Sequence, residues 1–180
     1  MSNMANAFIT KFDRIACDLR TTVGVRAHSE SLDGSGLKEM AAVWDTGATS
    51  SVVAESEAKA LGLIPVSYTV MSTPNGERVV PCYYVDIVLP NMVGFKKVLV
   101  LEALLCSCGM LIGMDLITQG DFAVSNHNGK TAFTFRCPSL MEFNFVNYTY
   151  LQPETGQAMR PNSRCFCGSG KKYKQCCGKP

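Results

Sequence analysis

Two Asn-Gly pairs, Asn75-Gly76 and Asn128-Gly129, each lie between stretches that are rich in β-branched and aromatic residues. Both residues of an Asn-Gly pair tolerate positive φ angles, which tight turns between antiparallel strands require. Each pair therefore predicts a β-hairpin. The predicted hairpin strands are residues 66–72 with 78–89, and residues 121–125 with 131–136. A chain with two such hairpins is expected to build its core mainly from antiparallel strands.

Most of the chain up to residue 150 shows the same preference for extended structure. One helix is predicted at residues 54–61, where acidic residues favour the first turn, Lys59 favours the last, and Gly62 ends it. A short second helix is expected after Gly113. Further strands are predicted at residues 8–19, 40–44, 96–101 and 141–150, and a loop at residues 29–36. We find no internal repeat and no alternation of strands with helices, so the predicted fold class is mostly β with one or two short helices.

The charge of the chain is small overall but uneven. There are 17 basic and 15 acidic residues, a net charge of +2, which predicts no strong attraction to nucleic acids or acidic lipids. Residues 158–180 hold six of the basic residues and no carboxylate, so this segment has a charge of +6 and the rest of the chain −4. Nucleic acid is therefore not expected as the main target, and any preference for a partner is expected from local patches.

Composition also bounds the domain organisation. With 180 residues, 47% of them hydrophobic, the chain can bury the core of one ordinary domain and carry a small appendage. Residues 152–162 are mainly polar and contain two prolines and one glycine, which indicates a linker. The predicted division is a domain of residues 1–150, a linker of residues 151–160 and a C-terminal motif of residues 161–180.

No segment predicts a membrane span or a secretion signal. The longest apolar runs, such as residues 97–105, fall short of the roughly 20 residues that a membrane helix needs. The start of the chain has no positive region followed by an apolar stretch. Four of the nine cysteines lie within thirteen residues near the C-terminus, which is typical of a metal site rather than of secreted disulfides. We therefore expect a cytoplasmic protein without membrane attachment.

Residues 44–49, Trp-Asp-Thr-Gly-Ala-Thr, place one carboxylate, Asp45, at a turn between two apolar stretches. Gly113 stands 68 residues after Asp45, follows the apolar pair Leu111-Ile112 and precedes the expected short helix. This combination resembles the signature of the retropepsin-like aspartic proteases, and the resemblance covers about residues 8–136. It implies a closed β domain of the acid-protease type.

For the chemistry, the resemblance implies a homodimer in which each chain contributes one Asp45. Two adjoining carboxylates that share one proton can activate water and protonate the peptide carbonyl, so one chain alone is expected to be inactive. Thr46 would hydrogen-bond across the two-fold axis, and Gly47 would let the backbone approach the carboxylates. The predicted catalytic residues of this aspartic endopeptidase are Asp45, Thr46 and Gly47. Dimer contacts are expected from apolar residues of the second hairpin, Phe122, Val124, Phe133 and Phe135.

The first hairpin falls where the family has its flap, a loop that closes over the substrate. The expected substrate is an extended, largely apolar stretch of polypeptide that binds chiefly through its main chain. The residues predicted to contact it are those of the turn, Thr73, Pro74, Asn75 and Gly76, together with Met110 and Leu111. Met71 and Val79 are further candidates for apolar subsites.

The same sequence allows a plainer interpretation. An Asp-Thr-Gly after a strand is also an ordinary turn in which the aspartate accepts local hydrogen bonds. Asp115 and Asp121 are expected to be structural, as a helix-start acid and a turn residue. Cys106 and Cys108 are expected to be buried and to act as small apolar residues. The two histidines stand near no plausible nucleophile in the chain, so a serine or cysteine mechanism has no support.

The C-terminal segment carries four cysteines, Cys165, Cys167, Cys176 and Cys177. Four thiolates at this spacing can close a tetrahedral Zn²⁺ site, and a segment of about twenty residues has too little apolar surface to fold without such a clamp. The predicted cofactor is therefore one structural Zn²⁺ per chain, and a pair of disulfides is the alternative. A phosphate-binding loop is excluded, because its pattern requires Gly at position 165 and Ser or Thr at position 172.

This segment also resembles the SEC-C motif, a short zinc element found at the end of the bacterial preprotein translocase ATPase, and the resemblance spans residues 161–178. It implies docking to a chaperone-like partner or to the ribosome; the alternative role is a clip that only stabilises the C-terminus. The predicted function is thus a homodimeric aspartic endopeptidase that a zinc-bound tail guides to polypeptides. The alternatives are a non-catalytic dimeric peptide-binding adapter with the same tail, and association with the ribosome or RNA through the basic tail.

Overall fold

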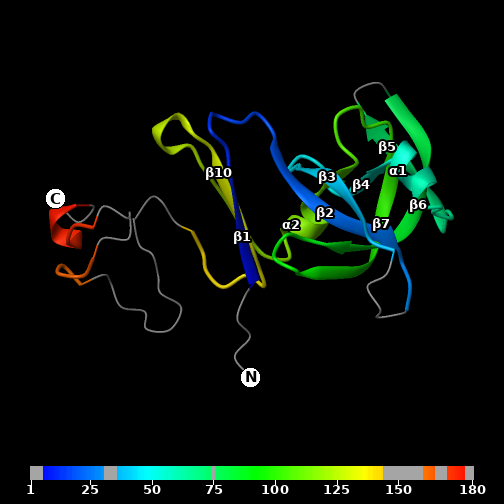
Figure 1. The fold of residues 1–180 in the computed structure, drawn as a ribbon. Helices are drawn as coiled ribbons and strands as arrows, with labels where there is room; N and C mark the ends of the chain where they lie inside the picture. Colours follow the sequence, from blue (N-terminus) through cyan, green and yellow to red (C-terminus); the bar gives the residue numbers. More distant parts are fainter. Residues whose placement is uncertain (1–5, 31–35, 74–75, 144–159, 165–169, 177–180) are drawn as a thin grey trace. The chain divides into compact units, whose positions relative to one another are not determined.

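The computed structural model describes residues 6–30, 36–73, 76–143, 160–164 and 170–176. The chain forms two compact units, Met1–Ser139 and Leu140–Pro180 (Figure 1). Within the described ranges, no helix has both the length and the apolar character that crossing a membrane requires.

The first unit is built around a seven-stranded sheet in the order β2-β3-β8-β4-β7-β6-β5. Its strands are β2 (Leu19–Ala27), β3 (Lys38–Trp44), β4 (Val52–Ala54), β5 (Ser67–Thr73), β6 (Gly76–Val88), β7 (Gly94–Ala103) and β8 (Met110–Ile112). Strand β2 also pairs with β6, with Gly24 opposite Val88, so the sheet closes into a ring that leaves β5 outside. The prediction of a closed, mostly β domain is therefore confirmed.

A second sheet has three strands in the order β1-β10-β9. Their bounds are β1 (Asn6–Lys11), β9 (Asp121–Ser125) and β10 (Ala132–Cys137). In Figure 1 the blue β1 and the yellow β10 run side by side next to the ring. Alternate side chains of β10 face inward, so Phe133 and Phe135 are 1% and 0% exposed and belong to the same core as the ring residues. One hydrophobic core thus serves both sheets.

The two short helices lie where the sequence predicts them. Helix α1 spans Glu55–Ala60, and helix α2 spans Met114–Ile117. Gly62 follows α1 with a φ of 62°, a left-handed conformation that glycine adopts without strain. Both predicted hairpins are confirmed, because β5 pairs with β6 and β9 pairs with β10 in antiparallel orientation. A short 3₁₀ turn, η1 (His127–Gly129), lies between β9 and β10.

The strand predicted over residues 8–19 is wrong in its second half. Strand β1 ends at Lys11 and β2 begins at Leu19, and the chain between them turns around the buried side chain of Thr131. The Ala16 N–H donates to the Thr131 hydroxyl at 2.9 Å. This hydrogen bond joins residues 115 positions apart, so no local pattern could have shown it.

Strand β2 beyond Leu19 was not predicted at all. Its residues do alternate as those of a half-buried strand do, because Thr21, Val23 and Val25 are buried while Arg20, Thr22 and Gly24 are less so. In the structure, β2 pairs with β3 on one side and with β6 on the other. The period-two pattern was therefore present in the sequence, and sequence reasoning missed it.

In the second unit the described residues form a small reversed segment. An antiparallel bridge joins Arg164 to Lys172, and the Tyr173 N–H donates to the Ser163 carbonyl at 2.8 Å. The 3₁₀ turn η2 (Tyr173–Gln175) follows. Residues 141–143 have no regular structure, and the rest of the strand predicted at residues 141–150 lies outside the described residues.

Candidate active site

Asp45 lies directly after β3, where two neighbouring strands end together. Strands β3 and β8 run parallel, with Trp44 opposite Ile112, and the Asp45 N–H donates to the Ile112 carbonyl at 2.9 Å. Side chains alternate across a strand, so Trp44 points into the core while the half-buried Asp45 lines a cleft. The strand end therefore holds the backbone of Asp45 and leaves its carboxylate accessible.

The turn after Asp45 holds the carboxylate in one orientation. The Gly47 N–H donates to Asp45 Oδ1 at 2.8 Å, and the Ala48 N–H donates to the Asp45 carbonyl at 3.3 Å. A Cβ atom at Gly47 would lie 3.2 Å from Asp45 Oδ1 and would crowd the carboxylate. Thr46 is exposed in the same turn. The three residues predicted to be catalytic thus share one turn, and their catalytic roles stay a prediction.

A hydrogen-bond network ties the loop after Asp45 to helix α2. Ser51 is buried, and its Oγ and N–H donate to the two carboxylate oxygens of Asp115 at 2.8 and 3.0 Å. The Gly113 N–H donates to Ser51 Oγ at 3.0 Å. Asp115 also accepts the Leu116 N–H at 3.0 Å, which confirms its expected role as a helix-start acid. Sequence reasoning missed Ser51, because no local pattern pairs a serine with an aspartate 64 residues away.

Gly113 is the point where this segment comes closest to the loop. A Cβ atom at Gly113 would lie 2.6 Å from the carbonyl carbon of Ser50 and 2.9 Å from the Ser51 nitrogen. Both are backbone atoms, which cannot rotate away as a side chain can. The contact expected for Gly113 is therefore present, but with the loop a few residues beyond the Asp-Thr-Gly turn rather than with the turn itself.

Asp45 opens onto a cleft of about 1100 Å³. The loop after Asp45, from Gly47 to Ser50, lines one part of it, and residues 67–72 of β5 line another. Asp45 is the only charged residue among the described residues that line the cleft. Apart from Asp45, the described lining therefore offers no ionic partner to a charged ligand.

Part of the cleft is lined by a row of side chains that crosses four adjacent strands. Leu111 of β8 lies opposite Val52 of β4, which in turn lies opposite Leu101 of β7. Leu101 lies opposite Cys82 of β6. Partners in register share a face of the sheet, so these four residues line the cleft together.

Met110 does not belong to this row. It is 0% exposed and part of the hydrophobic core, so the prediction that its side chain contacts the substrate is wrong. Successive residues of a strand face opposite sides, which lets Leu111 line the cleft only if Met110 points into the core. The apolar run of β8 does not show which of the two residues faces outward.

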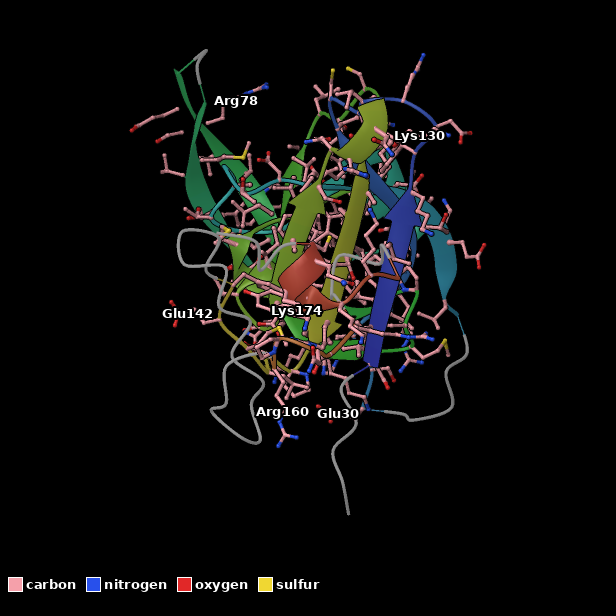
Figure 2. All side chains as sticks on the ribbon, turned by 90° about the vertical axis from the view of Figure 1, so that its left-hand side faces the viewer. Glu30, Arg78, Lys130, Glu142, Arg160 and Lys174 are labelled. Atoms are coloured by element: carbon pink, nitrogen blue, oxygen red, sulfur yellow. The ribbon has the colours of Figure 1, made fainter. Side chains whose placement is uncertain are left out.

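Strands β5 and β6 form the hairpin that was predicted to be the flap. Figure 2 shows this hairpin extending beyond the ring. Thr73 pairs with Gly76 at its end, and Pro74 and Asn75 lie outside the described residues. The cleft is lined by β5 along residues 67–72, including Met71. Contact between the turn itself and a substrate stays a prediction.

The prediction that Phe133 and Phe135 form dimer contacts is wrong. Both are buried in the core of their own chain, because β10 is the middle strand of its sheet and its inner face packs on the ring. Phe122 is half-buried and stacks on Trp44, whereas Val124 is exposed. Of this set, Val124 alone is exposed, at 41%.

The expected burial of the Cys106 and Cys108 pair is not observed. Cys106 is exposed and Cys108 is half-buried. Arg20 holds the loop between them at the surface, since its Nη1 donates to the Ser107 carbonyl at 2.6 Å. Over the described ranges, no group of three or more His, Cys, Asp or Glu residues could hold a metal ion.

Of the four predicted zinc ligands, the structure describes one, while three lie outside the described residues: Cys165, Cys167 and Cys177. Cys176 is half-buried, and its N–H donates to the Tyr173 carbonyl at 3.0 Å. An antiparallel bridge joins Arg164, the residue before Cys165, to Lys172, which lies four residues before Cys176. Four cysteines are a ligand set that structural zinc sites use, and zinc binding by this set stays a prediction.

Two residues of β6, Tyr83 and Asp86, make hydrogen bonds that involve a carboxylate outside the cleft. Burial and a hydrogen bond to Glu102 at 2.6 Å raise the pKa of Tyr83 well above its ordinary value. Burial acts to raise the pKa of Asp86 too, but hydrogen bonds from His28, from the Lys97 N–H and from Arg26 outweigh it and hold this pKa below its ordinary value. Both contacts fasten β6 to its neighbours, and neither residue lines the cleft.

Comparison with known proteins gives a match in each unit. Residues 31–116 match the aspartyl protease family model, and residues 162–179 match the SEC-C motif. A retropepsin-like aspartic protease from Rickettsia conorii has a similar crystal structure, with a TM-score of 0.53 and 17% identity over 74% of this chain and 96% of that one. This likeness shows the fold of the first unit.

Two further matches are partial. The EIAV protease complexed with the inhibitor HBY-793 aligns with a TM-score of 0.42 and 17% identity over 56% of this chain and 85% of that one. A stretch of 28 residues is 64% identical to the protein translocase subunit SecA of Geotalea uraniireducens (strain Rf4). That stretch is 16% of this chain and spans only 3% of the length of SecA.

Proposed function

Because the chain combines a retropepsin-like aspartic protease domain with a C-terminal SEC-C motif, we propose that it is an aspartic endopeptidase that acts as a homodimer. The observation that carries this proposal is the position of Asp45. Its backbone is held at the end of β3, and its side chain lines a neutral cleft of about 1100 Å³. A cleft of this size is large enough for an extended stretch of polypeptide.

The need for two copies follows from the number of carboxylates. Asp45 is the only carboxylate among the described residues that line the cleft. Peptide hydrolysis without a covalent intermediate needs one group to take a proton from water and another to protonate the carbonyl oxygen. A second copy of the chain supplies the second Asp45, as in a symmetric dimer whose two-fold axis passes between the two side chains.

In this mechanism the ionised Asp45 takes a proton from water while the water oxygen bonds to the carbonyl carbon. The protonated Asp45 gives its proton to the carbonyl oxygen, which yields a tetrahedral diol. The diol then returns one hydroxyl proton to a carboxylate as its carbonyl re-forms. The other carboxyl gives a proton to the leaving nitrogen, and the C–N bond breaks. The pair ends with one shared proton, as it began, and the Gly47 N–H keeps the Asp45 carboxylate in place throughout.

The substrate we propose is an extended stretch of polypeptide with apolar side chains. The row of Leu111, Val52, Leu101 and Cys82 offers an apolar surface, and the described part of the cleft lining contains no cation that would attract an acidic residue. Among the described strands β5 pairs with β6 alone, so its other edge offers backbone groups to which an extended main chain could bind.

We assign a docking role to the tail. Cys165, Cys167, Cys176 and Cys177 would hold one Zn²⁺, which would stabilise the segment and take no part in hydrolysis, since four thiolates leave the metal no open position. The described basic residues of the segment are exposed and suit an acidic surface on a chaperone or on the ribosome. A cytoplasmic location agrees with reduced thiols.

A second candidate function is a dimeric peptide-binding adapter without catalysis. The hydrogen bond from the Gly47 N–H to Asp45 favours this function, because an aspartate in an ordinary, non-catalytic turn accepts the same hydrogen bond. The cleft would then bind peptide without cutting it. The two functions differ in whether Asp45 is needed for the formation of fragments.

The first experiment compares the purified protein with its Asp45→Asn variant on a mixture of unfolded proteins across pH. We expect fragments from the unsubstituted protein only, and we expect a pepstatin-like inhibitor to suppress them. Fragments from both forms would reveal a contaminating protease. Peptide binding without fragments from either form would favour the adapter.

The second experiment tests the shared site. Equal amounts of the two forms are unfolded and refolded together, so that mixed dimers form. If each site needs two intact Asp45 residues and pairing is random, about one quarter of the dimers remain active. Activity per unsubstituted chain should therefore fall to about one half, and unchanged activity per unsubstituted chain would rule out a shared site.

A further inference from the structure

Trp44, the residue before Asp45, joins the candidate active site to the three-stranded sheet. Its indole is 5% exposed and packs against phenylalanines from all three strands of that sheet. The ring centroid of Trp44 lies 4.9 Å from that of Phe135, 5.7 Å from Phe122, 5.8 Å from Phe8 and 5.8 Å from Phe133. The Phe122 ring is stacked on the indole, with 13° between the two planes.

The polar edge of the indole is held as well. Trp44 Nε1 donates to Thr21 Oγ1 at 2.9 Å, and Thr21 is buried in β2. The backbone of Trp44 lies between Leu19 of β2 and Ile112 of β8. With aromatic rings around the indole and a hydrogen bond at its nitrogen, the side chain is confined to one orientation.

This packing joins the two sheets through their side chains. Within the described ranges, no strand of the three-stranded sheet pairs with a strand of the ring. The sheets are joined along the chain by residues 12–18 and 118–120, and through space by the shared core and a hydrogen bond from Asn91 to the Asn6 carbonyl. Trp44 is the residue of this core that directly precedes Asp45, so a displacement of β1, β9 or β10 can reach the carboxylate through it.

We propose that Trp44 is a positioning residue for Asp45, through which the packing of the three-stranded sheet sets the place of the carboxylate in the cleft. One peptide bond separates the two residues, and they point to opposite sides of the strand. The proposal rests on the proposed function of Asp45. Two carboxylates that share a proton must meet closely, and a displacement of about 1 Å can reduce a rate by about a hundredfold.

Trp44→Phe tests the proposal because it keeps an aromatic ring but removes the N–H and part of the stacking area. We expect kcat to fall about tenfold and KM to stay within about twofold, since Trp44 does not line the cleft. The matched control is Val85→Ala, which shortens a buried side chain of strand β6 that lies outside the aromatic cluster. The control should lower thermal stability and leave kcat unchanged; equal losses of kcat in both variants would overturn the proposal.

A second readout does not depend on hydrolysis. The Asp45 N–H is held by the Ile112 carbonyl, so its hydrogen exchange reports how firmly Asp45 is placed. We expect this exchange to be about tenfold faster in Trp44→Phe than in Val85→Ala at equal global stability. Equal exchange in the two variants would overturn the proposal even if the protein cuts no peptide. Absence of hydrolysis in the unsubstituted protein would contradict the proposed function alone.

Thr21 offers a milder variant should Trp44→Phe not fold. Trp44 is the single tryptophan of the chain, so its fluorescence reports this site alone. Thr21→Val removes the acceptor and should shift the emission and speed Asp45 exchange, whereas Thr21→Ser keeps the hydroxyl and should restore both. Exchange at Asp45 that stays unchanged while the emission shifts would show that the indole does not position the carboxylate.

Discussion

At the scale of single residues, the candidate site depends on close contacts between backbone atoms. Gly47 sits against the Asp45 carboxylate, and Gly113 sits against the backbone of Ser50 and Ser51. At both positions a side chain would collide with nearby atoms, whereas the φ angle is open to any residue. The two glycines of the motif therefore mark positions of close contact.

Gly113→Ala should destabilise the first unit by about 2–3 kcal/mol, because its Cβ atom would lie 2.6 Å from the Ser50 carbonyl carbon and force the two segments apart. The measurement is the free energy of unfolding in urea. The control is Gly94→Ala, whose Cβ atom would meet nothing closer than 4.0 Å. Similar values for the two variants would show that the loop yields easily.

Asp86 predicts a pH dependence of stability. Hydrogen bonds hold the pKa of Asp86 in the folded protein below its ordinary value, although burial opposes them. Stability from this group is thus fully present above the unfolded-state pKa of about 3.9 and is lost as pH falls through the lower folded-state pKa. Asp86→Asn should cost about 3 kcal/mol at pH 7, since the Asp86 side chain is buried against Arg26.

The check is the free energy of unfolding from pH 7 to pH 2. The Asp86→Asn variant should lose less stability below about pH 4 than the unsubstituted protein does. The control is Asp13→Asn, which replaces a fully exposed carboxylate that lies 4.0 Å from Lys130 and should leave the profile unchanged. Parallel profiles for Asp86→Asn and the unsubstituted protein would contradict the assignment.

At the scale of elements, β1 connects the first residues of the domain to its core. It pairs with β10 along its whole length, and its inward residue Phe8 contacts Trp44, Phe133 and Phe135. The strand thereby completes the sheet that packs behind Asp45. Sequence reasoning placed a strand here but could not show which of its faces is buried.

Phe8→Ala should lower the free energy of unfolding by about 3 kcal/mol, because it leaves a cavity beside Trp44. The neighbouring substitution Ile9→Ala is the control: Ile9 is 57% exposed on the outer face of the same strand and should change stability by less than about 0.5 kcal/mol. Equal losses would mean that β1 contributes through its backbone pairing alone.

At the scale of the whole molecule, the chain carries two units of different kinds. The first has a large hydrophobic core of its own, whereas the second is short and has a charge that is strongly positive at its C-terminal end. A segment as short as residues 161–180 has too little apolar surface to fold alone, so we expect it to depend on a metal or on a partner for its stability. Stability of the two units should therefore respond to different treatments.

A zinc chelator should unfold residues 161–180 and leave the first unit folded, with hydrolysis of a short peptide unchanged. Metal analysis should give about one zinc per chain, and NMR signals of the tail should lose their dispersion on chelation. Cys176→Ser is the matched variant and should reproduce the loss without chelator. Unfolding of the first unit by the chelator would contradict the separation of roles.

Local features were predictable from the sequence because short-range chemistry determines them. Three such features are the two Asn-Gly hairpins, the helix that ends before Gly62, and the approach of the Gly113 segment to the chain just after Asp45. Each depends on a few neighbouring residues or on one known signature. Patterns of this kind can be detected in the sequence alone. They were sufficient to indicate the fold class and the candidate catalytic aspartate.

Only the tertiary structure decided which face of each strand is buried and which distant residues meet. The inward side chains of Met110, Phe133 and Phe135, and the hydrogen bonds between Ser51 and Asp115, depend on the pairing of β8 with β3 and β4 and on the packing of the two sheets. Such contacts join residues far apart in the chain. The sequence of an apolar strand is the same whichever of its faces is buried, so it does not show which face that is.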